Sequence, residues 1–245
     1  MGTKEDDVIA QLTGPGGAFE IQTVPVHGVP LRVFATAPSS LRDLWLIGAA
    51  RGDVPYLIYG DEVITFGAAH RMVCSLAQWL VDHGVKKGDR VAIGMRNYPE
   101  WAIAYWAIQC VGGISVSLNA WWIAEELKYA LSDSETTVVI VDGERLDRLS
   151  DDLLREVGVR HAVVVRGDAR PGVTPWTDTV ADVSANLPNV DIAPDDDATI
   201  LYTSGTTGFP KGAVGSNRNH VTNVWNGLFR AAQNAALADP NAPRP

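Results

Sequence analysis

The sequence feature that most constrains this chain is the stretch from Thr199 to Val214, in which an apolar run gives way to a loop of small and hydroxylated residues. The β-branched start of the stretch predicts a buried strand. Glycines in the loop let the backbone approach a ligand closely and turn its N–H groups toward it. The hydroxyl groups add neutral donors, and Lys211 adds a positive charge for phosphate oxygens. A strand followed by such a loop predicts a site for a polyphosphate.

This loop differs from the Walker phosphate loop. That motif places its lysine directly after the second glycine, and a serine or threonine directly after the lysine. Here two residues separate Gly208 from Lys211, and Gly212 follows the lysine, so no hydroxyl is placed there to bind magnesium. The other interpretation is a Gly/Ser/Thr-rich linker. A linker needs neither a buried strand before it nor a Pro-Lys-Gly sequence at its end, and the phosphate-binding interpretation is therefore favoured.

The segment from Tyr202 to Gly212 resembles the signature loop of the adenylate-forming superfamily, which contains acyl-CoA synthetases, adenylation domains of peptide synthetases and luciferases. The resemblance implies that this loop binds the β- and γ-phosphates of ATP and the pyrophosphate that leaves. The residues that the resemblance assigns to this role are Thr203, Ser204, Gly205, Thr206, Thr207, Gly208 and Lys211.

The rest of the chain predicts an α/β fold of mostly parallel sheets flanked by helices, because predicted strands and helices alternate. By resemblance this is the N-terminal part of the adenylate-forming enzyme fold, in truncated form. Strands are expected at 56–59, 63–65, 90–95, 114–118, 136–141 and 161–165, and helices at 41–47, after Thr65, and at 99–111, 125–131, 144–156 and about 217–236.

Three segments are expected along the chain. Glycines and prolines without periodicity predict an irregular or partly extended leader over residues 1–38. Residues 39–237 are expected to form a partial N-terminal domain of an adenylate-forming enzyme, with the ATP phosphate loop at 202–212. Within it, the prolines of residues 167–196 predict a largely irregular connection. Residues 238–245 are expected to be a disordered tail.

Charge and composition restrict the function classes. The net charge of −9 and the lack of a Lys/Arg cluster argue against nucleic acid and anionic membranes as partners. The most apolar stretch, 101–118, is interrupted by glycines and polar residues, which favours a helix followed by a strand over a membrane span. Cys74 and Cys110 have no metal-ligand spacing and predict buried free thiols in a reducing compartment. We therefore expect a cytoplasmic protein.

No residue is a candidate for nucleophilic catalysis or metal binding. The acidic run Asp195–Asp197 lies next to a proline and is better explained as a solvated loop than as a metal site. The five histidines are scattered, neither cysteine has a base that the sequence identifies, and no Gly-x-Ser-x-Gly elbow occurs. The catalytic residue is therefore unknown, and no metal ligand is predicted.

The segment from Arg96 to Leu127 further resembles bacterial fatty-acid–CoA ligases. The resemblance implies that a fatty-acid carboxylate attacks the α-phosphate of ATP bound with Mg²⁺. This step would give an acyl-adenylate and pyrophosphate, after which the thiol of coenzyme A would displace AMP. Positioning and charge stabilisation carry such a step more than a protein nucleophile does. The implied small molecules are ATP, Mg²⁺, a fatty acid and coenzyme A as a substrate.

The chain also departs from the family pattern. It is shorter than typical members, and Lys211 is its last lysine, so the C-terminal catalytic lysine of the family has no counterpart. We therefore expect an N-terminal fragment that is inactive alone and either self-associates or requires a complementing C-terminal half. Two alternatives stay open: a non-catalytic module for nucleotide or pyrophosphate binding or for assembly, and a fragment of an amino-acid adenylation domain.

Overall fold

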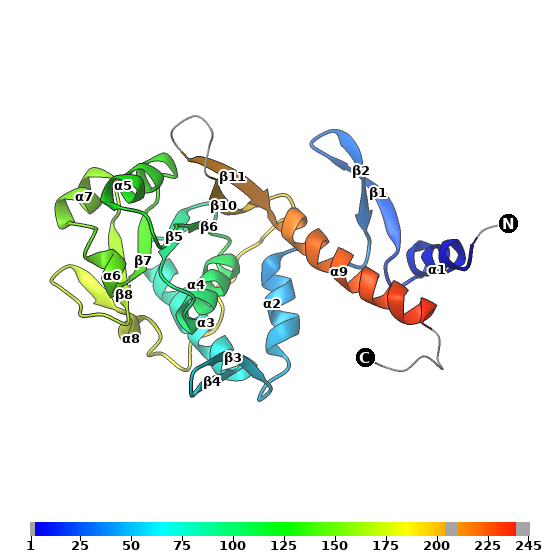
Figure 1. The fold of residues 1–245 in the computed structure, drawn as a ribbon, viewed down its shortest axis with the longest axis horizontal. Helices are drawn as coiled ribbons and strands as arrows, with labels where there is room; N and C mark the ends of the chain where they lie inside the picture. The colour runs from blue at the N-terminus through cyan, green and yellow to red at the C-terminus, as the bar shows by residue number, and fades with distance from the viewer. Residues whose placement is uncertain (1–2, 204–209, 239–245) are drawn as a thin grey trace.

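The computed structural model describes residues 3–203 and 210–238, and its centre is a seven-stranded sheet (Figure 1). The strand order is β11-β10-β6-β5-β7-β8-β9, and every neighbouring pair is parallel except β10 and β11. The strands are β5 (Arg90–Gly94), β6 (Ile114–Ser117), β7 (Val138–Asp142), β8 (His161–Val165), β9 (Val173–Pro175), β10 (Asp197–Thr203) and β11 (Lys211–Ser216). The predicted α/β class with a mostly parallel sheet is confirmed.

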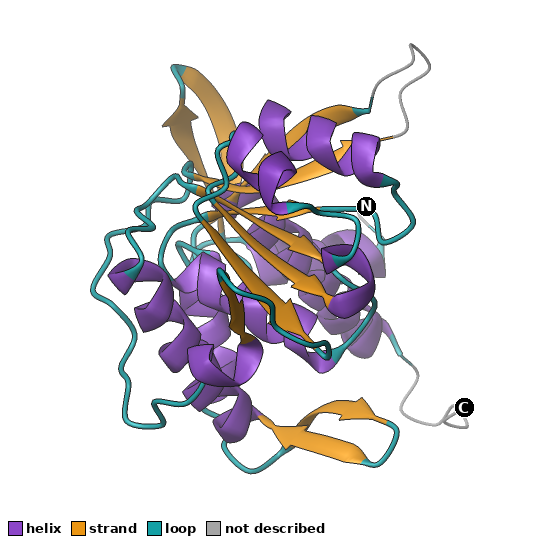
Figure 2. Ribbon diagram, turned by 90° about the vertical axis from the view of Figure 1, so that its left-hand side faces the viewer, coloured by secondary structure: helices purple, strands orange, loops and turns teal. Residues whose placement is uncertain are grey.

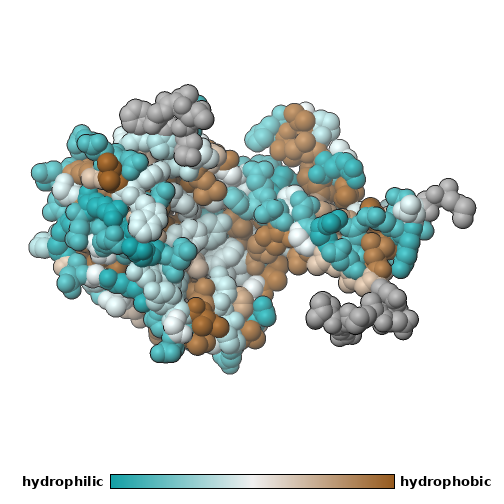
Figure 3. Space-filling view, in the orientation of Figure 1, coloured by the Kyte–Doolittle hydropathy of each residue, from teal (hydrophilic) through white to brown (hydrophobic). Residues whose placement is uncertain are grey.

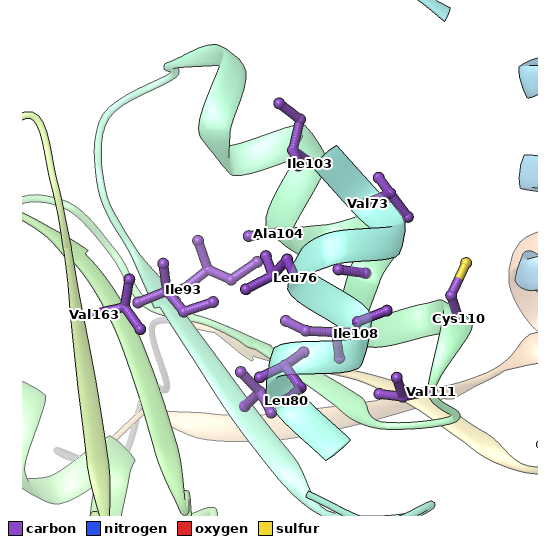
Figure 4. Close-up of a cluster of buried hydrophobic side chains, with 14 of the residues drawn as sticks. Val73, Leu76, Leu80, Ile93, Ile103, Ala104, Ile108, Cys110, Val111 and Val163 are labelled. Atoms are coloured by element: carbon purple, nitrogen blue, oxygen red, sulfur yellow. The ribbon is translucent and has the colours of Figure 1, made fainter. Parts of the chain in front are cut away.

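Helices cover both faces of this sheet (Figure 2). One face packs against α3 (Phe66–Asp82) and α4 (Pro99–Cys110), and the other packs against α5 (Ala124–Asp133), α6 (Gly143–Leu146) and α7 (Asp151–Glu156). Successive side chains of a strand point to opposite faces, so Ile93 belongs to the first core and Ala92 to the second. Figure 4 shows Ile93 and Val163 of the sheet beside Leu76 and Ile108 of the two helices.

Several helices begin where their capping residues predict. Thr65 accepts a hydrogen bond from the backbone N–H of Ala68 at the start of α3. Pro99 is the first residue of α4, where a backbone N–H would have no hydrogen-bond acceptor within the helix, so the lack of an N–H in proline costs little. Ser40 and Asp43 form a capping box at the start of α2 (Leu41–Ala49). The expected hairpin is also present, as β3 (Pro55–Tyr59) and β4 (Glu62–Thr65).

Residues 1–38 are more regular than the expected irregular or partly extended leader. These residues contain α1 (Lys4–Thr13) and an antiparallel hairpin of β1 (Ile21–Val26) and β2 (Val29–Phe34). The prolines do not break the hairpin because Pro25 and Pro30 face each other in the second pair from the two-residue turn, where neither N–H is required for the ladder. His27 and Gly28 both have positive φ angles, 48° and 80°, as a type I′ turn requires.

Other boundaries also differ from the prediction. The helix expected over 144–156 is divided into α6 and α7, because Ser150 caps a new helix by accepting from the backbone N–H of Leu153. The connection 167–196 contributes the edge strand β9 and the short helix α8 (Trp176–Thr179).

The last helix, α9 (Asn217–Leu237), is capped by Ser216, and Asn219 completes the capping box as its third residue. Of the tail predicted for 238–245, residues 239–245 lie outside the described part of the chain. No helix within residues 3–203 and 210–238 is both long and apolar enough to cross a membrane.

Candidate phosphate-binding site

The predicted phosphate loop is framed by the antiparallel pair β10 and β11 at one edge of the sheet. Thr203 ends β10, Lys211 begins β11, and the two residues are direct cross-strand partners. The hydroxyl of Thr203 lies 3.4 Å from the carbonyl oxygen of Lys211, to which it donates. Since β10 runs parallel to β6, Thr203 lies at the carboxyl edge of the parallel strands, where α/β folds commonly bind ligands.

Two of the seven predicted site residues can be placed. Thr203 and Lys211 are brought together, and both are exposed. Among the described residues, the ammonium group of Lys211 has no ion-pair or hydrogen-bond partner, so its charge is available to an anion. The other five, Ser204, Gly205, Thr206, Thr207 and Gly208, lie outside the described residues.

Tyr202 anchors β10 to the helix beside it. Its hydroxyl donates to the carboxylate of Asp133 at 2.7 Å and to the carbonyl of Ala130 at 3.2 Å. The ring of Trp122 contacts the Tyr202 ring edge-on, with 5.8 Å between the centroids. Burial, reinforced by the neighbouring Asp133 carboxylate, raises the pKa of the Tyr202 hydroxyl, which stays protonated. The residue before Thr203 is therefore an anchor of the strand rather than an acid or base.

Glycines on β11 allow its close approach to β10 and α9. A Cβ atom on Gly212 would lie 2.8 Å from Cγ2 of Ile200, and one on Gly215 would lie 2.7 Å from Nε2 of His220. The same His220 nitrogen lies 2.8 Å from the hydroxyl of Thr199 on β10, which ties the helix to the strand. The glycine after Lys211 thus has a packing reason in addition to its place in the motif.

A buried ion pair lies at the same carboxyl edge, and no sequence pattern predicted it. The guanidinium of Arg145 lies 3.1 Å from the carboxylate of Asp142, and both side chains are almost fully buried. Nε of Arg145 donates to the carbonyl of Ala120 at 2.8 Å, which fixes the segment that follows β6. The backbone N–H of Arg96, after β5, donates to the same Asp142 carboxylate at 3.1 Å. This pair therefore holds together the ends of three central strands.

Neither cysteine is placed as a nucleophile. Both are buried, and burial raises the pKa of each thiol, so the thiols stay protonated. His70 and Cys74, one helical turn apart on α3, are in contact, with 3.6 Å between Nε2 and Sγ, although no sequence motif marks the pair. Nδ1 of His70 accepts from the indole N–H of Trp45 at 3.2 Å. The contact belongs to the packing of α2 against α3.

The acidic run before β10 has structural partners. Asp195 forms a two-pronged ion pair with Arg218, at 2.6 and 2.9 Å, and Asp196 pairs with Lys87 at 2.6 Å. These pairs connect the entry of β10 to α9 and to the turn before β5. Within the described parts of the chain, no group of three or more His, Cys, Asp or Glu side chains could hold a metal ion.

The chain matches a known protein family and individual known proteins. A protein-family model described as AMP-binding enzyme matches residues 47–239. A medium/long-chain-fatty-acid–CoA/3-oxocholest-4-en-26-oate–CoA ligase of Mycobacterium marinum is 33% identical over 166 residues, covering 64% of this chain and 30% of the relative. A 3-hydroxybenzoate–CoA/4-hydroxybenzoate–CoA ligase of Thauera aromatica is 36% identical over 170 residues, covering 69% of this chain and 32% of the relative.

A solved structure shares the fold. The crystal structure of a long-chain-fatty-acid–CoA ligase from Archaeoglobus fulgidus matches with a TM-score of 0.69 at 24% identity. The match covers 80% of this chain and 40% of the other. The chain thus spans less than a third of the length of the two curated relatives, and less than half of the solved one.

Proposed function

Because the chain belongs to the AMP-binding enzyme family, whose relatives include acid–CoA ligases, we propose that it carries the ATP phosphate-binding part of a fatty-acid–CoA ligase. The observation that supports this proposal is the pairing of Thr203 with Lys211. The pairing holds both ends of the signature loop together at the carboxyl edge of the sheet. It also leaves the Lys211 ammonium group exposed and, among the described residues, unpaired.

The proposed role of the loop follows from its residue types. Lys211 would bind phosphate oxygens as a point charge, and the Thr203 hydroxyl would donate to them in place of its 3.4 Å hydrogen bond to the Lys211 carbonyl. Residues 204–208 would add backbone N–H groups and hydroxyl donors, as glycine-rich phosphate loops do. Mg²⁺, when bound with ATP, would neutralise part of the phosphate charge. The loop would then hold the β- and γ-phosphates while a carboxylate attacks the α-phosphate and pyrophosphate leaves.

The acid is proposed to be a fatty acid because residues 96–127 resemble bacterial fatty-acid–CoA ligases. One relative is named for medium- and long-chain fatty acids and another for hydroxybenzoates, so the family alone does not select between an aliphatic and an aromatic acid. Coenzyme A is proposed as the second substrate because the enzymes that this segment resembles are CoA ligases. Adenylation of an amino acid and a non-catalytic phosphate-binding role are the competing proposals.

The relatives are about three times as long as the region they share with this chain, and the complete reaction is proposed for proteins of that full length. Self-association or a complementing half is a separate proposal. Exposed apolar side chains support it: Val29 and Leu31 on β2, and Val224 and Leu228 on α9. Figure 3 shows apolar surface over both elements.

Isothermal titration with Mg–ATP tests the proposed phosphate site. We expect saturable binding that Lys211→Ala weakens by about 1–3 kcal/mol, the scale of a charge-assisted contact. Lys86→Ala is the matched control, because Lys86 is also exposed and has no side-chain partner among the described residues but lies before β5, at the amino edge of the sheet. Equal affinity of the Lys211→Ala variant and the wild type would remove Lys211 from the site.

A further inference from the structure

A cavity lies away from the phosphate loop, between the N-terminal elements and α9. It has a volume of about 370 Å³ and is lined by residues of α1, β1, β2 and α9. In Figure 1 these elements form the right-hand part of the molecule, whereas the ends of β10 and β11 that frame the loop lie to the left. Residues 1–46, which supply three of the four walls, precede the region matched by the family model.

The walls of this cavity are mainly apolar. Ile9, Ile21 and Val33 line it together with Phe34 and Phe229.

Phe34 and Phe229 belong to a cluster of three aromatic rings completed by Phe19. The ring centroids lie 5.6 Å apart for Phe19 and Phe229, and 6.2 Å apart for Phe19 and Phe34. Edge-on contacts at these distances are favourable for aromatic pairs and hold the rings in place. The cavity therefore has a fixed aromatic floor.

Polar side chains also line this cavity. Among the described residues, Arg32, Thr222 and Asn226 make no side-chain hydrogen bond or ion pair. The hydroxyl of Thr13, by contrast, already donates to the carbonyl of Ile9 at 2.8 Å. Among the lining residues that the structure describes, Arg32 is the only charged one, so this part of the surface is cationic although the chain as a whole carries a net charge of −9.

Contacts outside the cavity hold its walls together without a ligand. The side-chain amide of the buried Gln233 donates to the carboxylate of Glu5 at 3.0 Å, which joins α9 to α1. The indole N–H of Trp225 lies 3.4 Å from the hydroxyl of Thr36, which joins α9 to the segment after β2. A cavity built this way needs little rearrangement to bind a small molecule, which lowers the free-energy cost of binding.

We propose that this cavity binds a monocarboxylate with an apolar body. The aliphatic and aromatic walls would bury the body, and a volume of about 370 Å³ lies within the usual range for small-molecule sites. The planar guanidinium of Arg32 can bind a carboxylate through two parallel hydrogen bonds, with Thr222 and Asn226 as further donors. One positive charge balances a carboxylate but leaves a phosphate monoester only half neutralised. The proposal does not depend on the function of the phosphate loop.

Decanoate is the probe for this site, titrated calorimetrically into the full 245-residue chain below its micelle concentration. We expect saturable binding of one decanoate per chain, at least about tenfold weaker in Arg32→Gln. Arg160→Gln is the matched control, because Arg160 is an exposed arginine without a partner among the described residues and lies between α7 and β8. Decanol, which lacks the charge, is expected to bind the wild type about tenfold more weakly than decanoate does. Its affinity for Arg32→Gln is expected to equal its affinity for the wild type.

A second variant tests the location independently of the charge. Thr222→Phe adds a ring to the lining without removing a hydrogen bond, and it should abolish binding while the circular dichroism spectrum stays unchanged. Absence of decanoate binding by the wild type would overturn the proposal, as would unchanged binding by both Arg32→Gln and Thr222→Phe. Tighter binding of decyl phosphate than of decanoate would overturn the choice of a carboxylate. Mg–ATP titrations of the same samples report separately on the phosphate loop.

Discussion

Replacing Arg145 by leucine should destabilise the fold strongly, because it leaves a buried carboxylate without its counter-ion. Asp142 would keep two backbone donors, the N–H groups of Arg96 and residue 145, at 3.1 and 3.0 Å. Removing one partner of a buried ion pair typically costs about 3–5 kcal/mol. Because the two backbone hydrogen bonds remain, we expect the lower end, about 3 kcal/mol. The carbonyl of Ala120 would also lose its closest donors.

Urea unfolding followed by circular dichroism measures this loss. Asp142→Asn combined with Arg145→Leu should recover at least about 1 kcal/mol of it, because the double variant leaves no buried charge and the single amide oxygen can still accept one of the two backbone hydrogen bonds. Arg155→Leu is the control, since its ion pair with Asp152 is exposed and contributes about 0–1 kcal/mol. A loss below about 1 kcal/mol in the single Arg145 variant, or no recovery in the double variant, would refute the argument from burial.

Two further predictions concern stability. Burial lowers the pKa of His70, His161 and His220, so each binds protons less readily in the folded than in the unfolded chain. The stability they contribute is therefore fully present above about pH 6.5 and is lost as the pH falls below it; urea midpoints that do not decrease between pH 7.5 and pH 5 would contradict this. Gly215→Ala should cost about 1–3 kcal/mol by forcing its Cβ against His220. Gly227→Ala, with open space around it, should be neutral or stabilising, and equal unfolding midpoints for both variants would contradict the steric argument.

Local chemistry made much of the fold predictable. The β-branched runs at 90–95 and 161–165 form interior strands of the sheet, and Thr65 and Ser40 cap helices as expected. The order of the strands was not predictable in this way, because it depends on which faces pack together. β5 lies between β6 and β7 although it precedes both along the chain. The N-terminal hairpin was missed because Pro25 counts against a strand unless its cross-strand position is known.

The candidate site was predictable in part. The motif singled out the candidate loop and Lys211, but the sequence did not show that Thr203 and Lys211 face each other across two strands. The anchors of the site join residues distant in sequence, such as Tyr202 with Asp133 and Arg145 with Ala120, and no local pattern marks such pairs. The cavity between β2 and α9 also depends on the fold, because its walls come from the two ends of the chain.

The central claim, that loop 202–212 binds the β- and γ-phosphates of ATP, is tested most directly by comparing two ligands. Pyrophosphate contains the groups that the loop is proposed to hold, and AMP lacks them. Isothermal titration of each into the wild-type chain with Mg²⁺ should show saturable binding of pyrophosphate and at least about tenfold weaker binding of AMP. Binding of AMP as tight as that of pyrophosphate, or no pyrophosphate binding at millimolar concentration, would contradict the account.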